Sequence, residues 1–208
     1  MVLSIQNEYS SGEIQFLKNL NSPQKIQDYL NTLEFNFEQR GETCYSPRNV
    51  IKHKKAHCME GAMFAAAVLE FHGAKSMVLD LRSESHDFDH VVAVFKQFGF
   101  FGAISKTNHA VLRYREPIYA SVRELAMSYF HEYFDKKGKK TLREYSEPFD
   151  LRYFDFLDWR TTEKHLFAIP EYLDKIKHFI ILSSAQIKNL RKADKIEIKA
   201  GELVEWKK

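Results

Sequence analysis

The spacing of apolar residues along the chain predicts two helices in its first third. Ser22 followed by Pro23 is typical of a helix start, and the apolar residues after it recur at helical spacing, which predicts a helix over 23–34. The same period begins again at Cys58 and ends at Gly73, a residue suited to a left-handed helix end. Because most residues of this second helix are small, we expect it to lie at the centre of the fold.

Three apolar, β-branched runs predict strands after that helix. They are SMVLDL (76–81), HVVAVF (90–95) and FFGAIS (100–105). If Phe95 and Phe100 close a hairpin around the loop KQFG, His90 lies directly opposite Ser105 on the neighbouring strand.

The pattern in the second half of the chain is less regular. The Ser121–Glu124 spacing of a capping box predicts a helix to about Phe134, and DKKGKK (135–140) is interpreted as a solvated basic turn. We further predict a helix after Pro170, a strand in HFIIL (178–182) and a strand pair in KIEIK and ELVEW (195–206). This divides the chain into a core, 1–150, with its N-terminal helix, and a C-terminal extension, 151–208, packed on the core or forming a small subdomain.

Composition narrows the class of protein. The chain has 208 residues with 44% hydrophobic content, enough for a substantial core. Its 31 basic and 28 acidic residues nearly cancel, so no nucleic-acid partner is predicted. No run approaches the roughly 20 apolar residues of a membrane span. The two cysteines are too few for a disulfide framework, and we therefore expect a cytoplasmic protein.

Cys58 is the candidate nucleophile because of its place at a helix start. There the positive end of the helix dipole and unpaired backbone N–H groups favour a thiolate. His90 opens a predicted strand and is the candidate base, while Ser105, opposite it, would orient the imidazole. A buried structural cysteine is the simpler alternative, since free cysteines are usually buried.

The residues around Cys58 and His90 carry a resemblance. AHCMEGAMFAAAVLEFHGAKSMVLDL, followed by DHVVAVF and GAISKTNH, resembles the core of the transglutaminase-like cysteine-protease superfamily over roughly residues 42–135, closest to uncharacterised bacterial members. The resemblance implies an α+β fold of papain-like type, with the central helix packed on an antiparallel sheet. It matches Cys58 and His90 to the first two catalytic positions. Where the family has an acid, this chain has Ser105, with Asn108 as an equal candidate and Asp89 as a third.

The resemblance implies acyl transfer or amide hydrolysis through a thioester on Cys58, acting on a peptide or protein and needing no cofactor. A degenerate module that binds a peptide without reaction is the alternative, since the acid is missing. Aromatic residues would line its groove: Phe88, Phe98, Phe100, Phe101 and Tyr114. A zinc site is not favoured, because the pairs spaced by four, His53–His57 and His86–His90, do not fall on predicted helices. The oligomeric state stays open.

Overall fold

One antiparallel sheet is the centre of the computed structural model, which describes residues 7–207. In this part of the chain the sheet has seven strands in the order β6-β5-β4-β3-β7-β9, with β8 also paired to β3. The strands are β3 (Met77–Ser83), β4 (His90–Gln97), β5 (Phe100–Ile104), β6 (Arg115–Tyr119), β7 (Leu142–Ser146), β8 (Phe149–Asp150) and β9 (His178–Ile180). The three strands predicted between 76 and 105 are confirmed as β3, β4 and β5.

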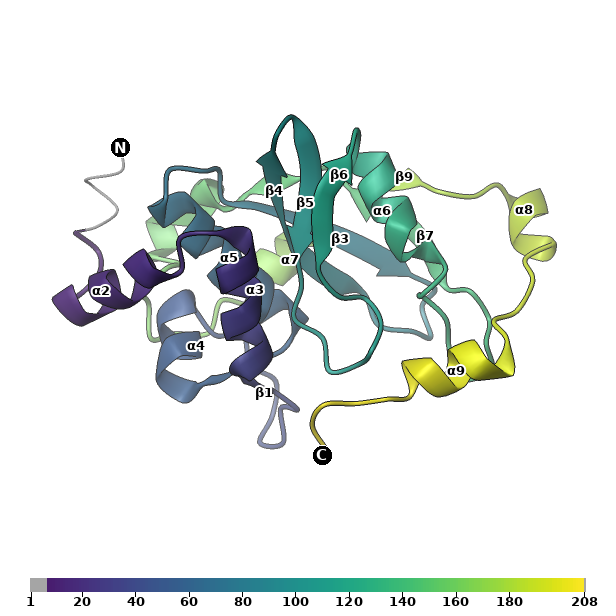
Figure 1. Cartoon of the computed structure of the whole chain (residues 1–208), viewed down its shortest axis with the longest axis horizontal. Helices are drawn as coiled ribbons and strands as arrows, with labels where there is room; N and C mark the ends of the chain where they lie inside the picture. Colours follow the sequence, from purple (N-terminus) through teal and green to yellow (C-terminus); the bar gives the residue numbers. More distant parts are fainter. Residues whose placement is uncertain (1–6, 208) are drawn as a thin grey trace.

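Helices lie on both sides of this sheet (Figure 1). On one side are α2 (Ser11–Asn19), α3 (Pro23–Thr32), α4 (Pro47–His53) and α5 (Cys58–Phe71), and a short parallel pair, β1 (Glu34–Phe35) and β2 (Lys55–Ala56), lies beside them. On the other is α6 (Val122–Phe130). The remaining helices are η1 (Leu151–Leu157), α7 (Ala168–Leu173), α8 (Ser184–Lys188) and α9 (Lys195–Gly201). The predicted α+β class is therefore confirmed, and none of the helices described is long and apolar enough to cross a bilayer.

Helix α5 is the most deeply buried helix of the fold. Every residue from Met59 to Phe71 is buried, and the helix packs against the face of β4 that carries Val91 and Ala93. The helix also comes close to the segment after β5, where a residue without a side chain is needed: a Cβ added at Gly61 would come within 2.4 Å of the Lys106 Cβ. The prediction of a central helix beginning at Cys58 is confirmed.

The β4–β5 hairpin has a different register from the one predicted. Gln97 pairs with Phe100, and the two residues between them, Phe98 and Gly99, have φ values of 54° and 87°. Positive φ at both positions makes a tight two-residue turn, so the ladder continues through residues that were assigned to a loop. Ser105 therefore comes level with Val92, not with His90, which is two residues away. A shift of two keeps the side chains on the same face of the sheet.

The C-terminal region differs most from prediction. KIEIK forms helix α9, with Asp194 as its N-cap and the Asp194 N–H bonded to Glu197 at 2.6 Å, so the predicted strand pair is wrong. A local cap outweighed the alternating apolar pattern. Segment 151–181 belongs to the extension that was expected to pack on the core or to form a small subdomain, and it contributes fully buried Trp159 and Ile169 to the core and β9 to the sheet. Helix α6 also ends early, at Phe130.

Candidate active site

The thiol of Cys58 lies at the first position of α5, half-buried and not in a disulfide. Burial raises the pKa of the thiol. Hydrogen bonds from His57 and His90 and the charges of both rings outweigh that effect and lower the pKa to about 5. Cys44 provides the contrast within the same chain: it is 1% exposed, and burial, together with the Glu60 charge, raises its pKa. Of the two cysteines, Cys58 therefore has the properties of a nucleophile.

His90 opens β4 and is held by Ser105 despite the shifted register. The distance from His90 Nε2 to the Ser105 hydroxyl oxygen is 2.8 Å, and that hydroxyl donates its own proton to the Leu112 carbonyl at 2.6 Å. The serine oxygen can then only accept from the imidazole, so Nε2 carries the hydrogen. This leaves Nδ1 for the thiol of Cys58. The structure brings Cys58, His90 and Ser105 together.

The position of Ser105 depends on a residue that the sequence pattern did not indicate. The buried amide of Gln27, on α3, accepts from the Ser105 N–H at 2.9 Å and donates to the Ser105 carbonyl at 2.8 Å. The one signal in the sequence was that Gln27, a polar residue, follows Ile26, which belongs to the apolar stripe of the predicted helix. Both backbone groups of Ser105 are thus satisfied where the β5 ladder ends.

Asn108 and Asp89, the other candidates for orienting the imidazole, bond elsewhere. The Asn108 side chain donates to the Trp206 carbonyl at 3.0 Å and accepts from the Trp206 N–H at 2.9 Å, so it anchors the C-terminal residues. The Asp89 carboxylate accepts from the Ser83 N–H at 2.7 Å. Of the three candidates, Ser105 is the one bonded to His90.

Glu60 is a second residue whose role the sequence did not predict. Its side chain lies in the first turn of α5, where an acid suits the helix dipole, and it is fully buried and accepts several hydrogen bonds. The donors are Asn36 Nδ2 at 2.9 Å, Thr43 Oγ1 at 2.8 Å, the Tyr45 N–H at 2.9 Å and the His57 N–H at 3.0 Å. Glu60 thereby joins the segment 36–45 to the start of α5, immediately beside the thiol.

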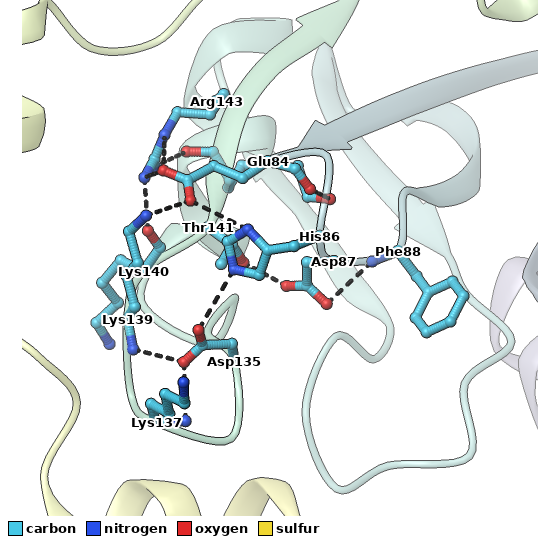
Figure 2. A network of polar contacts seen from close by, with 12 residues as sticks. Glu84, His86, Asp87, Phe88, Asp135, Lys137, Lys139, Lys140, Thr141 and Arg143 are labelled. Carbon is cyan, nitrogen blue, oxygen red and sulfur yellow. Dashed lines mark hydrogen bonds and ion pairs between the residues drawn. The ribbon is translucent and has the colours of Figure 1, made fainter.

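The loop that precedes His90 is braced by the basic turn at 135–140 (Figure 2). Glu84 accepts hydrogen bonds from Lys139 and Arg143, and its N–H donates to the Thr141 carbonyl at 3.0 Å. The turn itself is closed by Asp135, which accepts from the N–H groups of two of its lysines. The turn predicted as merely solvated therefore helps to fix the chain entering β4.

The residues named for a zinc site and for an aromatic groove do not gather in one place: of the four histidines, His57 and His90 lie at the Cys58 thiol and the other two lie elsewhere. His53 stacks on Tyr45, and His86 lies between Glu84 and Asp135. Phe88 precedes β4 and Phe98 follows it, so the strand's eight residues separate them by about 25 Å. Phe88, 89% exposed, is the one of this pair on the His90 side of the hairpin.

The comparisons with known proteins add no assignment. None of the models of known protein families matches this chain, and a search of curated proteins finds no significantly similar sequence. The function must therefore be argued from the geometry of Cys58, His90 and Ser105.

Proposed function

We propose that the protein is a cysteine-dependent enzyme of transglutaminase-like type that hydrolyses or transfers the acyl group of a peptide or protein amide. The observation that carries the proposal is a half-buried cysteine at a helix start, whose thiol has a pKa lowered to about 5 by an imidazole whose far nitrogen is fixed by Ser105. A structural cysteine needs none of these features. The helix of Cys58 against the strand of His90 agrees with the resemblance in sequence.

The reaction would proceed through a thioester. The Cys58 thiolate attacks the carbonyl carbon, a C–S bond forms, the C–N bond breaks, and the imidazolium of His90 gives its proton to the departing amine. Water or a second amine then attacks the thioester, gives a proton to His90, and the sulfur leaves as a thiolate. The backbone N–H at the start of α5 would stabilise the negative oxygen, because helix-start N–H groups lack partners within the helix.

The proposal is tested with purified protein and a library of peptides, with and without an added primary amine. Mass spectrometry distinguishes hydrolysis from amine incorporation. We expect Cys58→Ser to lower the rate at least about 10³-fold and His90→Ala about 10²- to 10⁴-fold. Cys44→Ala is the matched control: the protein molecules of this variant that stay folded should keep the parent activity.

Turnover that survives in Cys58→Ser would contradict the proposal. Saturable peptide binding with no turnover, and with Cys58 alkylated no faster than an ordinary thiol, would favour the binding module. The replacement of the expected acid by Ser105 is the observation that keeps this second function in view.

A further inference from the structure

His57 has contacts that the proposed reaction does not yet use. Its Nε2 lies 3.2 Å from the Thr43 carbonyl oxygen and 3.5 Å from a carboxylate oxygen of Glu60, with Glu38 at 3.9 Å. The ring also lies beside the sulfur of Cys58, which follows it directly in the chain, and a hydrogen bond to that sulfur is among the causes that raise the pKa of His57. With the sulfur ionised, the ring has hydrogen-bond acceptors on both sides, and an imidazole protonated on both nitrogens can donate to both.

We propose that His57 is the resident imidazolium partner of the Cys58 thiolate, kept charged by the buried carboxylate of Glu60, while His90 alone carries the proton through the reaction. The inference rests on Cys58 being the reacting thiol of the proposed function. It goes beyond that function by giving the site two imidazoles with separate tasks: one holds charge in place and the other exchanges a proton.

The surroundings of His57 favour the charged ring. Glu60 is fully buried and stays beside the ring whether or not the sulfur is acylated. Burial lowers the pKa of His57, but the hydrogen bond to Cys58 and the Glu60 charge raise it to about 9. The titratable groups around the thiol and the two imidazoles are Glu60 on the same helix, Glu38 and Cys44 from the preceding segment, His90 on β4, and Tyr133 after α6.

This arrangement gives a reason for the missing acid at Ser105. A hydroxyl can fix the tautomer of His90, but it adds no negative charge to hold an imidazolium there. The carboxylate lies instead beside His57, the other partner of the sulfur. The thiolate therefore does not depend on His90 keeping its proton, and His90 is free to give the proton up and take it back.

The test is the pH dependence of iodoacetamide alkylation, followed at Cys58 and Cys44 separately by peptide mass spectrometry. We expect a midpoint near pH 5 for Cys58 in the parent protein. His57→Gln, which keeps hydrogen-bonding groups without the charge, should raise the midpoint by about one pH unit or more. His90→Ala should keep it at least about one unit below the ordinary value near 8.5, and the double variant should return to that value.

His72→Gln is the matched control, since it changes a histidine at the opposite end of the same helix, where Nε2 bonds to the Leu17 carbonyl at 3.0 Å. It should leave the midpoint unchanged. The inference is overturned if His57→Gln keeps the parent midpoint, or if His90→Ala alone restores an ordinary thiol.

A measurement without any change at His57 protects the test against misfolding. ¹⁵N spectra of the parent protein at pH 7.5 should show both ring nitrogens of His57 protonated, and Cys58→Ser should lower the pH at which the ring titrates. A neutral His57 ring in the parent would refute the inference. Failure of the proposed function is separate: no peptide would be turned over, although the alkylation midpoints followed the expected order.

Discussion

Ser105 bonds to His90 at the position where an enzyme of the proposed type would have an acid. Its hydroxyl bonds to both His90 and the Leu112 carbonyl, so the imidazole is held by a neutral group whose own proton is already committed. That carbonyl belongs to the loop that begins at Ser105, in which Leu112 has a positive φ of 60°. Gln27 accepts a hydrogen bond from the N–H of Ser105 and so holds the start of the loop. Orientation of the base is thus provided by packing and backbone groups, without a second charge.

We predict that Ser105→Ala lowers turnover roughly 10- to 100-fold, the cost of a lost buried hydrogen bond, while the alkylation midpoint of Cys58 changes little. Steady-state kinetics and the alkylation profile together check this. Thr107→Ala is the control, because the Thr107 hydroxyl accepts from the His109 N–H and makes no described bond to His90. Equal losses in both variants would show that the loop, and not the hydroxyl, matters.

At the scale of elements, the site depends on how closely α5 approaches the chain that follows β5. Gly61, in the first turn of α5, touches the stem of Lys106, whose ammonium group is buried and donates to the carbonyls of Leu30 and Leu33 at the end of α3. A cation at a helix C-terminus stabilises the unpaired carbonyls there. The lysine therefore joins α3, α5 and the segment of Ser105 in one contact.

We predict that Gly61→Ala destabilises the protein by about 1–2 kcal/mol, since the added methyl group would meet a side chain anchored at its far end. Gly12→Ala is the matched control: Gly12 lies in α2 with nothing within 4 Å of the added atom, and the change should stabilise by about 0.5–1 kcal/mol. Urea unfolding measures both. A neutral or stabilising Gly61→Ala would contradict the close approach of the two segments.

At the scale of the whole molecule, a buried ion pair ties the region after residue 150 to the central helix. Arg160 donates two hydrogen bonds of 2.8 Å to Glu70 near the end of α5, and both side chains are only 3% exposed. Removing one partner leaves the other charge buried and unpaired, which is costly. The end of α5 opposite Cys58 is therefore fixed by a contact across ninety positions of sequence.

We predict that Arg160→Met costs about 3–5 kcal/mol of unfolding free energy, and that adding Glu70→Leu recovers part of the loss. Lys52→Ala removes one half of an exposed pair with Glu163 and should change stability by less than about 1 kcal/mol. Thermal and urea unfolding compare the variants. A double variant less stable than Arg160→Met would show that the charge left on Glu70 is not the source of the cost.

The sequence by itself determined the local elements of the site. The period of small residues and the turn signal at Gly73 predicted α5 with Cys58 at its start, and β-branched runs predicted β3, β4 and β5. The register of the hairpin was missed, yet an error of two residues left Ser105 on the face of His90, because side chains alternate with a period of two. Patterns of this kind involve neighbours along the chain and can be read from it.

Only the tertiary structure decided which groups complete the site. Ser105, and not Asn108, bonds to His90 because Gln27 holds the backbone of Ser105 while Trp206 binds the side chain of Asn108. These hydrogen bonds span 78 and 98 positions of sequence. The roles of His57 and Glu60 likewise depend on Thr43 and Asn36, brought to the helix start by the fold. Hydrogen bonds between distant segments leave no periodic trace in a sequence, so the place of Cys58 at a helix start was predictable and its surroundings were not.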